Sequence, residues 1–149
     1  MKIEVLEKND TNLRIIDKDA DIPLMNAIRR LALAEVPCMA IEEVVMIENS
    51  SILQDEIIAH RLGLTPLKTD LASYNLPDEC PCQSEFGCQQ CRVTLTLDAE
   101  AKDATRTVYS GEIVSENPEI IPVSDTIPIV KLAKNQKLKL EAYARLGKG

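Results

Sequence analysis

Four of the five cysteines fall within twelve consecutive positions, and this cluster constrains the fold more than any other feature of the chain. Its spacing is C-x-C-x5-C-x2-C, and Gly87 directly precedes the third cysteine. Two close cysteine pairs joined by a short loop can surround a tetrahedral Zn²⁺ with four thiolates. Such a site is structural, because four protein ligands leave no open position for a substrate.

Two disulfides or four free thiols are the alternatives to a metal at this cluster. Disulfides are disfavoured because nothing in the sequence indicates export, and because cysteines one residue apart are poorly placed to bridge each other. Little else would order the loop, since it is poor in apolar residues. The sequence therefore predicts a metal site, with zinc preferred to an iron–sulfur cluster, and its expected ligands are Cys80, Cys82, Cys88 and Cys91.

The charge and the aromatic content argue against direct binding of nucleic acid. The chain has 17 Lys and Arg against 24 Asp and Glu, a formal net charge of −7 and a pI near 4.8, which is the wrong sign for gripping phosphates. It has no tryptophan and one phenylalanine, too few rings for a stacking platform. We expect partners other than DNA or RNA.

Membrane insertion and export are also not expected. The longest apolar runs fall far short of the roughly 20 residues that span a bilayer, and the first residues lead into charge rather than a signal-peptide core. These features predict a cytoplasmic protein.

No arrangement of residues indicates an active site. His60 is the only histidine, and it falls near the end of a predicted helix, where a cation favours the helix dipole. Glu42 and Glu43 are adjacent on a predicted strand, so their side chains are expected on opposite faces. Cys38, the one cysteine outside the cluster, is expected to be a core thiol.

The first half of the chain mixes helix and strand. Turn-forming residues 9–12 separate two short β-favouring runs and predict a hairpin. Asp21 is the expected cap of a helix that holds Pro23 in its first turn and stops before Pro37. Further along, the pattern predicts a strand over 39–47 with a bulge at its glutamate pair, and a second helix over 53–62 capped by Ser50 and Ser51.

The predicted helix before Pro37 carries two apolar stripes, more than one sheet can cover. The first stripe is Leu24, Ile28 and Leu31, and the second is Met25, Ala32 and Val36. Either one face binds another chain, or the helix is sandwiched inside its own domain; both interpretations fit the pattern. Arg29 and Arg30 point roughly 100° apart on this helix, so they are either partner contacts or a solvated pair.

The second half of the chain is β-rich. Apolar and polar residues alternate over 93–101 and again over 137–146, which predicts two strands with one buried face each. A shorter run over 127–132 contains Pro128, which suits an edge strand or a strand start.

Several segments in order resemble the D subunit of archaeal DNA-directed RNA polymerase, a family related to the bacterial α subunit and to the third-largest subunit of eukaryotic polymerase II. They are NAIRRL from Asn26, VPCMAIEEV from Val36, ENSS from Glu48 and DEIIAHRLGLTPL from Asp55. The resemblance continues through the cysteine loop to Gly147-Lys148-Gly149 and covers nearly the whole chain. The cysteine loop is similar to the zinc-binding loop of the eukaryotic relative.

This resemblance implies an α+β fold in which a β-rich domain is inserted into an α-subunit-like dimerisation domain. Residues 1–70 would form the N-terminal part of the dimerisation domain, and residues 71–149 the inserted domain with the cysteine loop at 80–91. Family members continue beyond the equivalent of Gly149 with the rest of both domains, so the chain corresponds to an N-terminal portion. Many archaeal members also carry a ferredoxin-like iron–sulfur domain, and no cysteine follows Cys91.

The resemblance also implies a function that needs no active site in this chain, although the complex as a whole is a nucleotidyltransferase. Members of this family pair with the small L subunit and, with the small N and P subunits, form the platform for the two large catalytic subunits. The residues expected to contact partners are Met25, Ile28, Arg29, Arg30 and Ala32, with the two arginines facing the second-largest subunit. The competing hypothesis is a free-standing metal-binding redox or regulatory protein built on the cysteine loop.

Overall fold

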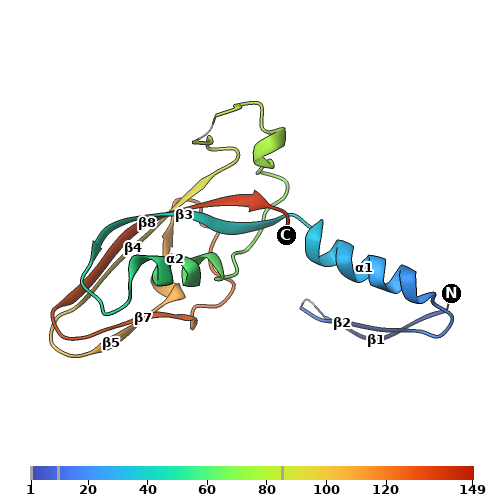
Figure 1. Ribbon diagram of the computed structural model, residues 1–149, viewed down its shortest axis with the longest axis horizontal. Helices are drawn as coiled ribbons and strands as arrows, with labels where there is room; N and C mark the ends of the chain where they lie inside the picture. The colour runs from blue at the N-terminus through green and yellow to red at the C-terminus, as the bar shows by residue number, and fades with distance from the viewer. Residues whose placement is uncertain (1, 10, 85) are drawn as a thin grey trace. The chain divides into compact units, whose positions relative to one another are not determined.

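The computed structural model describes residues 2–9, 11–84 and 86–149, and its contacts divide the chain into two compact units (Figure 1). The first unit is Met1–Val36 together with Gly149, and the second is Pro37–Lys148. The predicted boundary at residue 70 marks where one domain would be inserted into another, and the division into compact units does not test it. It stays a prediction. The predicted mixture of helix and strand is confirmed, with sheet predominating.

The first unit begins with the predicted hairpin. Strands β1 (Ile3–Lys8) and β2 (Leu13–Asp17) pair antiparallel. In the turn, Asn9 Oδ1 accepts hydrogen bonds from the backbone N–H groups of Thr11 and Asn12, at 3.0 and 2.6 Å. Asp10, which the sequence also assigned to this turn, lies outside the described residues.

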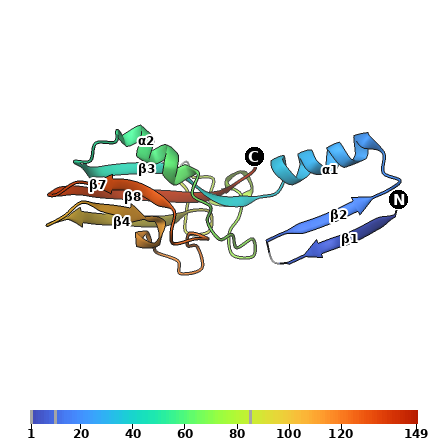
Figure 2. The same cartoon turned by 90° about the horizontal axis from the view of Figure 1, so that it is seen from below.

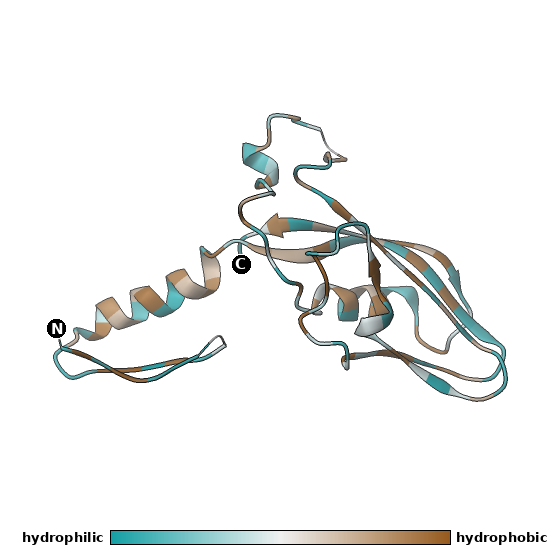
Figure 3. Ribbon diagram, turned by 180° about the vertical axis from the view of Figure 1, so that it is seen from behind, coloured by the Kyte–Doolittle hydropathy of each residue, from teal (hydrophilic) through white to brown (hydrophobic). Residues whose placement is uncertain are grey.

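Helix α1 (Ile22–Ala34) follows the hairpin and carries Pro23 in its first turn, as predicted. Asp21 occupies the N-cap position, but its side chain makes no capping hydrogen bond. All thirteen helix residues are described and none of them is buried within this chain. Colouring by hydropathy shows apolar positions recurring along the helix (Figure 3). The apolar side chains of α1 are thus not covered by the residues described here, and both interpretations of this helix stay predictions.

The second unit is built on a four-stranded antiparallel sheet in the order β3-β8-β4-β6. These strands are Cys38–Asn49, Gln136–Gly147, Val93–Ala101 and Val114–Ser115. Figure 2 shows strands β3, β8 and β4 of this sheet. The two alternating patterns predicted β4 and β8, which pair along their length with Leu97 opposite Leu140. The inward faces of both strands are buried, which fixes their register, because a one-residue slip would expose every apolar side chain.

Strand β3 has two bulges, one predicted and one not. The register shifts between Ile41 and Glu43, and again between Met46 and Glu48. The first bulge corrects the expectation that Glu42 and Glu43 face opposite ways. Both carboxylates lie near Arg145, with Nε 3.6 Å from Glu42 Oε2 and Nη2 3.9 Å from Glu43 Oε1. The extra residue of a bulge turns a neighbouring side chain toward the same face.

The apolar face of the sheet is covered by helix α2 (Asp55–Gly63) and a two-stranded ribbon. The ribbon pairs β5 (Arg106–Tyr109) with β7 (Pro128–Leu132), and short 3₁₀ turns lie at Pro77–Glu79 (η1) and Ser110–Glu112 (η2). Ile58 and Leu62 of α2 are fully buried in this core. Pro128 is the first residue of β7, which agrees with the prediction of a strand start at this proline.

Two local predictions were wrong. Gln54, not Ser50 or Ser51, is the N-cap of α2, because the two serines are engaged earlier: Ser50 Oγ accepts a bond from the Lys137 N–H at 2.7 Å. Cys38 is exposed rather than a core thiol, since it begins β3 and the buried side chain is its neighbour Met39.

Among the described residues, no helix is long and apolar enough to cross a bilayer.

Candidate metal centre

The cysteine loop lies between η1 and β4, beyond the end of the sheet (Figure 1). Cys80 follows η1 directly, and Cys91 stands two residues before the first residue of β4. Both of these thiols are buried, while Cys82 and Cys88 lie nearer the surface. The ordered elements on either side therefore position the first and last cysteine of the cluster.

The structure brings all four predicted ligands together. The Sγ atoms of Cys80 and Cys88 lie 3.6 Å apart, those of Cys82 and Cys91 3.8 Å, and those of Cys88 and Cys91 3.8 Å. All four sulfur atoms lie within 4.8 Å of one another. Four sulfurs at about 2.3 Å from a tetrahedral ion would be about 3.8 Å apart. The cluster thus has the dimensions of a four-thiolate metal site.

Backbone N–H groups point at the sulfurs and favour their charged form. Cys88 N–H donates to Cys91 Sγ at 3.1 Å, and Gln90 N–H donates to Cys88 Sγ at 3.4 Å. Hydrogen bonds of this kind orient metal ligands and stabilise thiolates. They arise because residues 88–92 form a tight turn in which Arg92 N–H bonds to Cys88 O at 2.9 Å.

The thiol pKa values differ widely within the cluster. Hydrogen bonding from the Ser84 backbone, followed by the Cys80 side chain, lowers the pKa of Cys82 to about 7. The Cys82 backbone acts to lower the pKa of Cys80, but burial and the neighbouring thiols outweigh it and raise that pKa to about 12. Burial also raises the pKa of Cys91. A bound cation would favour the thiolate form of all four cysteines, including those whose pKa is raised by burial.

Gly87 is the residue that lets the loop close. Its φ is +75°, a conformation that side-chain-bearing residues rarely adopt. A Cβ at this position would lie 3.3 Å from Cys91 Sγ and 3.3 Å from Arg92 Cβ. Gly87 is therefore required both by the backbone and by the space beside a ligand.

Two contacts that the sequence did not predict hold the loop in place, one across its neck and one to the sheet. Asn75 N–H donates to Gln90 O at 2.9 Å, which closes the neck of the loop. The Arg92 guanidinium lies over the Tyr143 ring, 4.3 Å from its centroid. The adjacency of Arg92 to Cys91 could have suggested such a role, but its aromatic partner lies 51 positions away in the sequence.

The residues expected to contact partners lie on α1, apart from the cysteine loop in sequence. Ile28, Arg29, Arg30 and Ala32 are exposed, and Met25 is half-buried. Arg29 donates to Asn26 Oδ1 from Nε and Nη2, at 3.3 and 2.9 Å. The structure thus leaves these side chains accessible, and their role as contacts stays a prediction.

The other candidate for chemistry in the sequence is His60 in helix α2. His60 is exposed in the last turn of α2, as the sequence predicted. Its neighbour Arg61 donates from Nη1 to the Ile129 carbonyl at 2.8 Å and so holds α2 against β7. Within the described residues, these groups form no acid–base or nucleophilic arrangement.

Comparison with known proteins gives matches over the whole chain. Residues 44–149 match the RNA polymerase Rpb3/RpoA insert domain family. The chain is 44% identical to DNA-directed RNA polymerase subunit Rpo3 of Methanosphaera stadtmanae over its full length, and 45% identical to that of Methanothermobacter thermautotrophicus. The Archaeoglobus fulgidus protein of the same name is 43% identical over 99% of the chain. The chain spans about half of these relatives, between 54% and 56% of their lengths.

Proposed function

The chain belongs to the RNA polymerase Rpb3/RpoA insert domain family, and from this membership we propose that it acts as a non-catalytic assembly subunit of a DNA-directed RNA polymerase. The observation that carries the proposal is identity of 43–45% to archaeal Rpo3 along essentially the whole chain. Rpo3 is another name for the archaeal D subunit that the sequence resembles. The competing hypothesis of a free-standing redox or regulatory protein is not favoured by these matches.

Partner binding through α1 is supported by the exposure of its apolar side chains. Ile28 and Leu31 are 48% and 56% exposed, although both belong to a stripe that would be a core face in an ordinary helix. An apolar stripe of this kind marks an interaction surface. We assign it to the small L subunit, with Met25, Ile28 and Ala32 as contacts, and we assign Arg29 and Arg30 to the second-largest subunit. The small N and P subunits and the other large subunit complete the proposed cytoplasmic complex.

Zinc is the metal that the sulfur positions favour. In a multi-iron cluster the cysteines are divided among different iron atoms, so sulfurs bound to different irons lie farther apart than the 4.8 Å within which all four sulfurs lie here. Residues Cys80, Cys82, Cys88 and Cys91 would hold the ion, which would supply structural cross-linking and no reaction chemistry. In this role the metal site orders a loop of the inserted domain, for which we retain the boundary at residue 70.

Affinity purification tests this proposal. The full-length protein that contains this chain, tagged and expressed in its own cells, is expected to bring down the large catalytic subunits and the small L, N and P subunits in equal amounts. The 149-residue chain, expressed by itself, should be colourless and contain one zinc ion. Recovery of the tagged protein alone, together with a coloured and redox-active form of the 149-residue chain, would support the competing hypothesis instead.

A further inference from the structure

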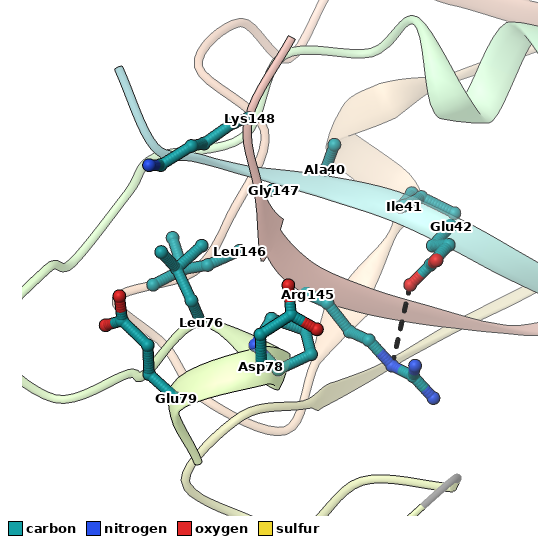
Figure 4. Close-up of a pocket in the computed structure, with 11 residues that line it drawn as sticks. Ala40, Ile41, Glu42, Leu76, Asp78, Glu79, Arg145, Leu146, Gly147 and Lys148 are labelled. Atoms are coloured by element: carbon teal, nitrogen blue, oxygen red, sulfur yellow. Dashed lines mark ion pairs between the residues drawn. The ribbon is translucent and has the colours of Figure 1, made fainter. Parts of the chain in front are cut away.

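A cleft of the second unit lies where η1 faces the ends of β3 and β8, beside the cysteine loop (Figure 4). We call it the Asp78 cleft; its volume is about 660 Å³. Its apolar lining includes Ile41, Leu76 and Leu146, and Leu76 also packs against the main core. The floor is thus apolar, while the walls carry charge.

The lining of the cleft carries more negative than positive charge. Its lining contains three carboxylates, from Glu42, Asp78 and Glu79, against two cations, from Arg145 and Lys148. Arg145 is shared by Glu42 and by Glu43 just outside the cleft. Asp78 and Glu79 make no side-chain hydrogen bond or ion pair within the described residues. Figure 4 shows both projecting from one wall, with Lys148 at the opposite rim.

An apolar floor beside uncompensated carboxylates suits one kind of side chain. Arginine and lysine bury a methylene stem on apolar surface and keep a charged head at its edge. Arginine can also bond two carboxylate oxygens at once. We propose that the Asp78 cleft binds an arginine- or lysine-bearing segment of another polymerase subunit, an inference that rests on the assembly role.

The cleft wall is coupled to the metal site through the backbone. Glu79 N–H bonds to Leu76 O at 3.0 Å, and Cys80 N–H bonds to Pro77 O at 3.3 Å. The two carboxylates therefore stand on the turn that leads directly into the first ligand. A metal ion that orders the loop would also hold this wall at its distance from β8.

Charge reversal within the assembled complex tests the proposal. The full-length protein would carry Asp78→Lys with Glu79→Lys, and a matched control would carry Asp103→Lys with Glu119→Lys, two exposed sites outside the cleft. Binding of each to the purified remaining polymerase subunits would be titrated. We expect at least about tenfold weaker binding for the cleft variant and no more than about a twofold change for the control. The neutral pair Asp78→Asn with Glu79→Gln should fall between them and show a smaller loss of affinity with added salt.

The outcomes separate this proposal from the one on which it rests. If the unaltered protein binds its partners and the reversed variant binds equally well, the cleft is not a contact and the assembly role stands. If the unaltered protein binds none of them, both proposals fail. Equal zinc content and equal melting temperature of the variants verify that they fold. If the charge-reversed variant does not fold, the affinity of the neutral pair tests whether the cleft is a contact. If the Asp103/Glu119 control binds as weakly as the cleft variant, the effect is due to net charge and the proposed contact in the cleft is wrong.

Discussion

The guanidinium carbon of Arg92 lies 4.3 Å from the centroid of the Tyr143 ring, and this contact joins the residue after Cys91 to strand β8. Tyr143 faces outward between Glu43 of β3 and Thr94 of β4. Its hydroxyl donates to Glu141 at 3.1 Å, and this bond raises its pKa. The cysteine loop is thereby attached to the sheet by an aromatic side chain as well as by the backbone.

Replacing Tyr143 by alanine should therefore loosen the loop. We expect a loss of about 1 kcal/mol in the free energy of unfolding, because a cation over an aromatic ring contributes about that much at a partly exposed site. Urea unfolding of the zinc-loaded chain measures the loss. The control is Tyr143→Phe, which keeps the ring and should stay close to the parent. A phenylalanine variant as unstable as the alanine variant would locate the effect in the hydroxyl.

Gly87→Ala should weaken metal binding. The methyl group meets Cys91 Sγ, and the left-handed backbone at φ +75° costs an alanine roughly 1 kcal/mol or more. Competition with a chromophoric chelator should then show zinc affinity lower by about fivefold or more. Gly147→Ala is the matched control, because a Cβ there meets nothing within 4 Å. Equal affinities of the two variants would contradict the assigned role of Gly87.

Removing the metal should release the loop and leave the sheet intact. The loop is ordered by its ligands and the turns around them, since Phe86, its large apolar residue, is 73% exposed. Hydrogen exchange after treatment with a zinc chelator should therefore accelerate over residues 77–92, while β4 and β8 keep their protection. Fast exchange throughout the second unit would instead mean that the metal holds the whole fold together.

Ile28→Asp should abolish pairing with a partner without destabilising the chain. Because Ile28 is 48% exposed, the substitution should change the free energy of unfolding by less than about 0.5 kcal/mol. In the proposed interface it would bury an unpaired charge. Asn26→Asp adds the same charge on the opposite side of the helix and keeps an acceptor for Arg29, so it should pair normally. Chemical denaturation and a pulldown with the L subunit measure the two effects.

The periodic parts of the fold could be predicted from the sequence because burial imposes the period. Alternation of apolar and polar residues predicted β4 to the residue, and the helical recurrence before Pro37 predicted α1. The cysteine spacing predicted that the four thiols come together, because the local chain alone brings the sulfurs close to one another. These features depend on residues near one another in the sequence.

What the sequence did not predict depends on distant pairing. The short strand β5 lacks a pattern of its own and exists because it pairs with β7. Glu42 and Glu43 share Arg145, about a hundred positions away, through a bulge whose effect on side-chain direction the strand rule does not capture. The stacking of Arg92 on Tyr143 and the Asp78 cleft likewise arise from tertiary structure.

Native mass spectrometry of the full-length protein co-expressed with an L-like small subunit tests the central claim most directly. An assembly subunit of this family should give a heterodimer with one copy of each protein and one zinc ion per complex. The Ile28→Asp variant, measured in the same way, should give separate monomers that still hold zinc. A monomer as the dominant species of the unaltered protein would contradict the assembly role.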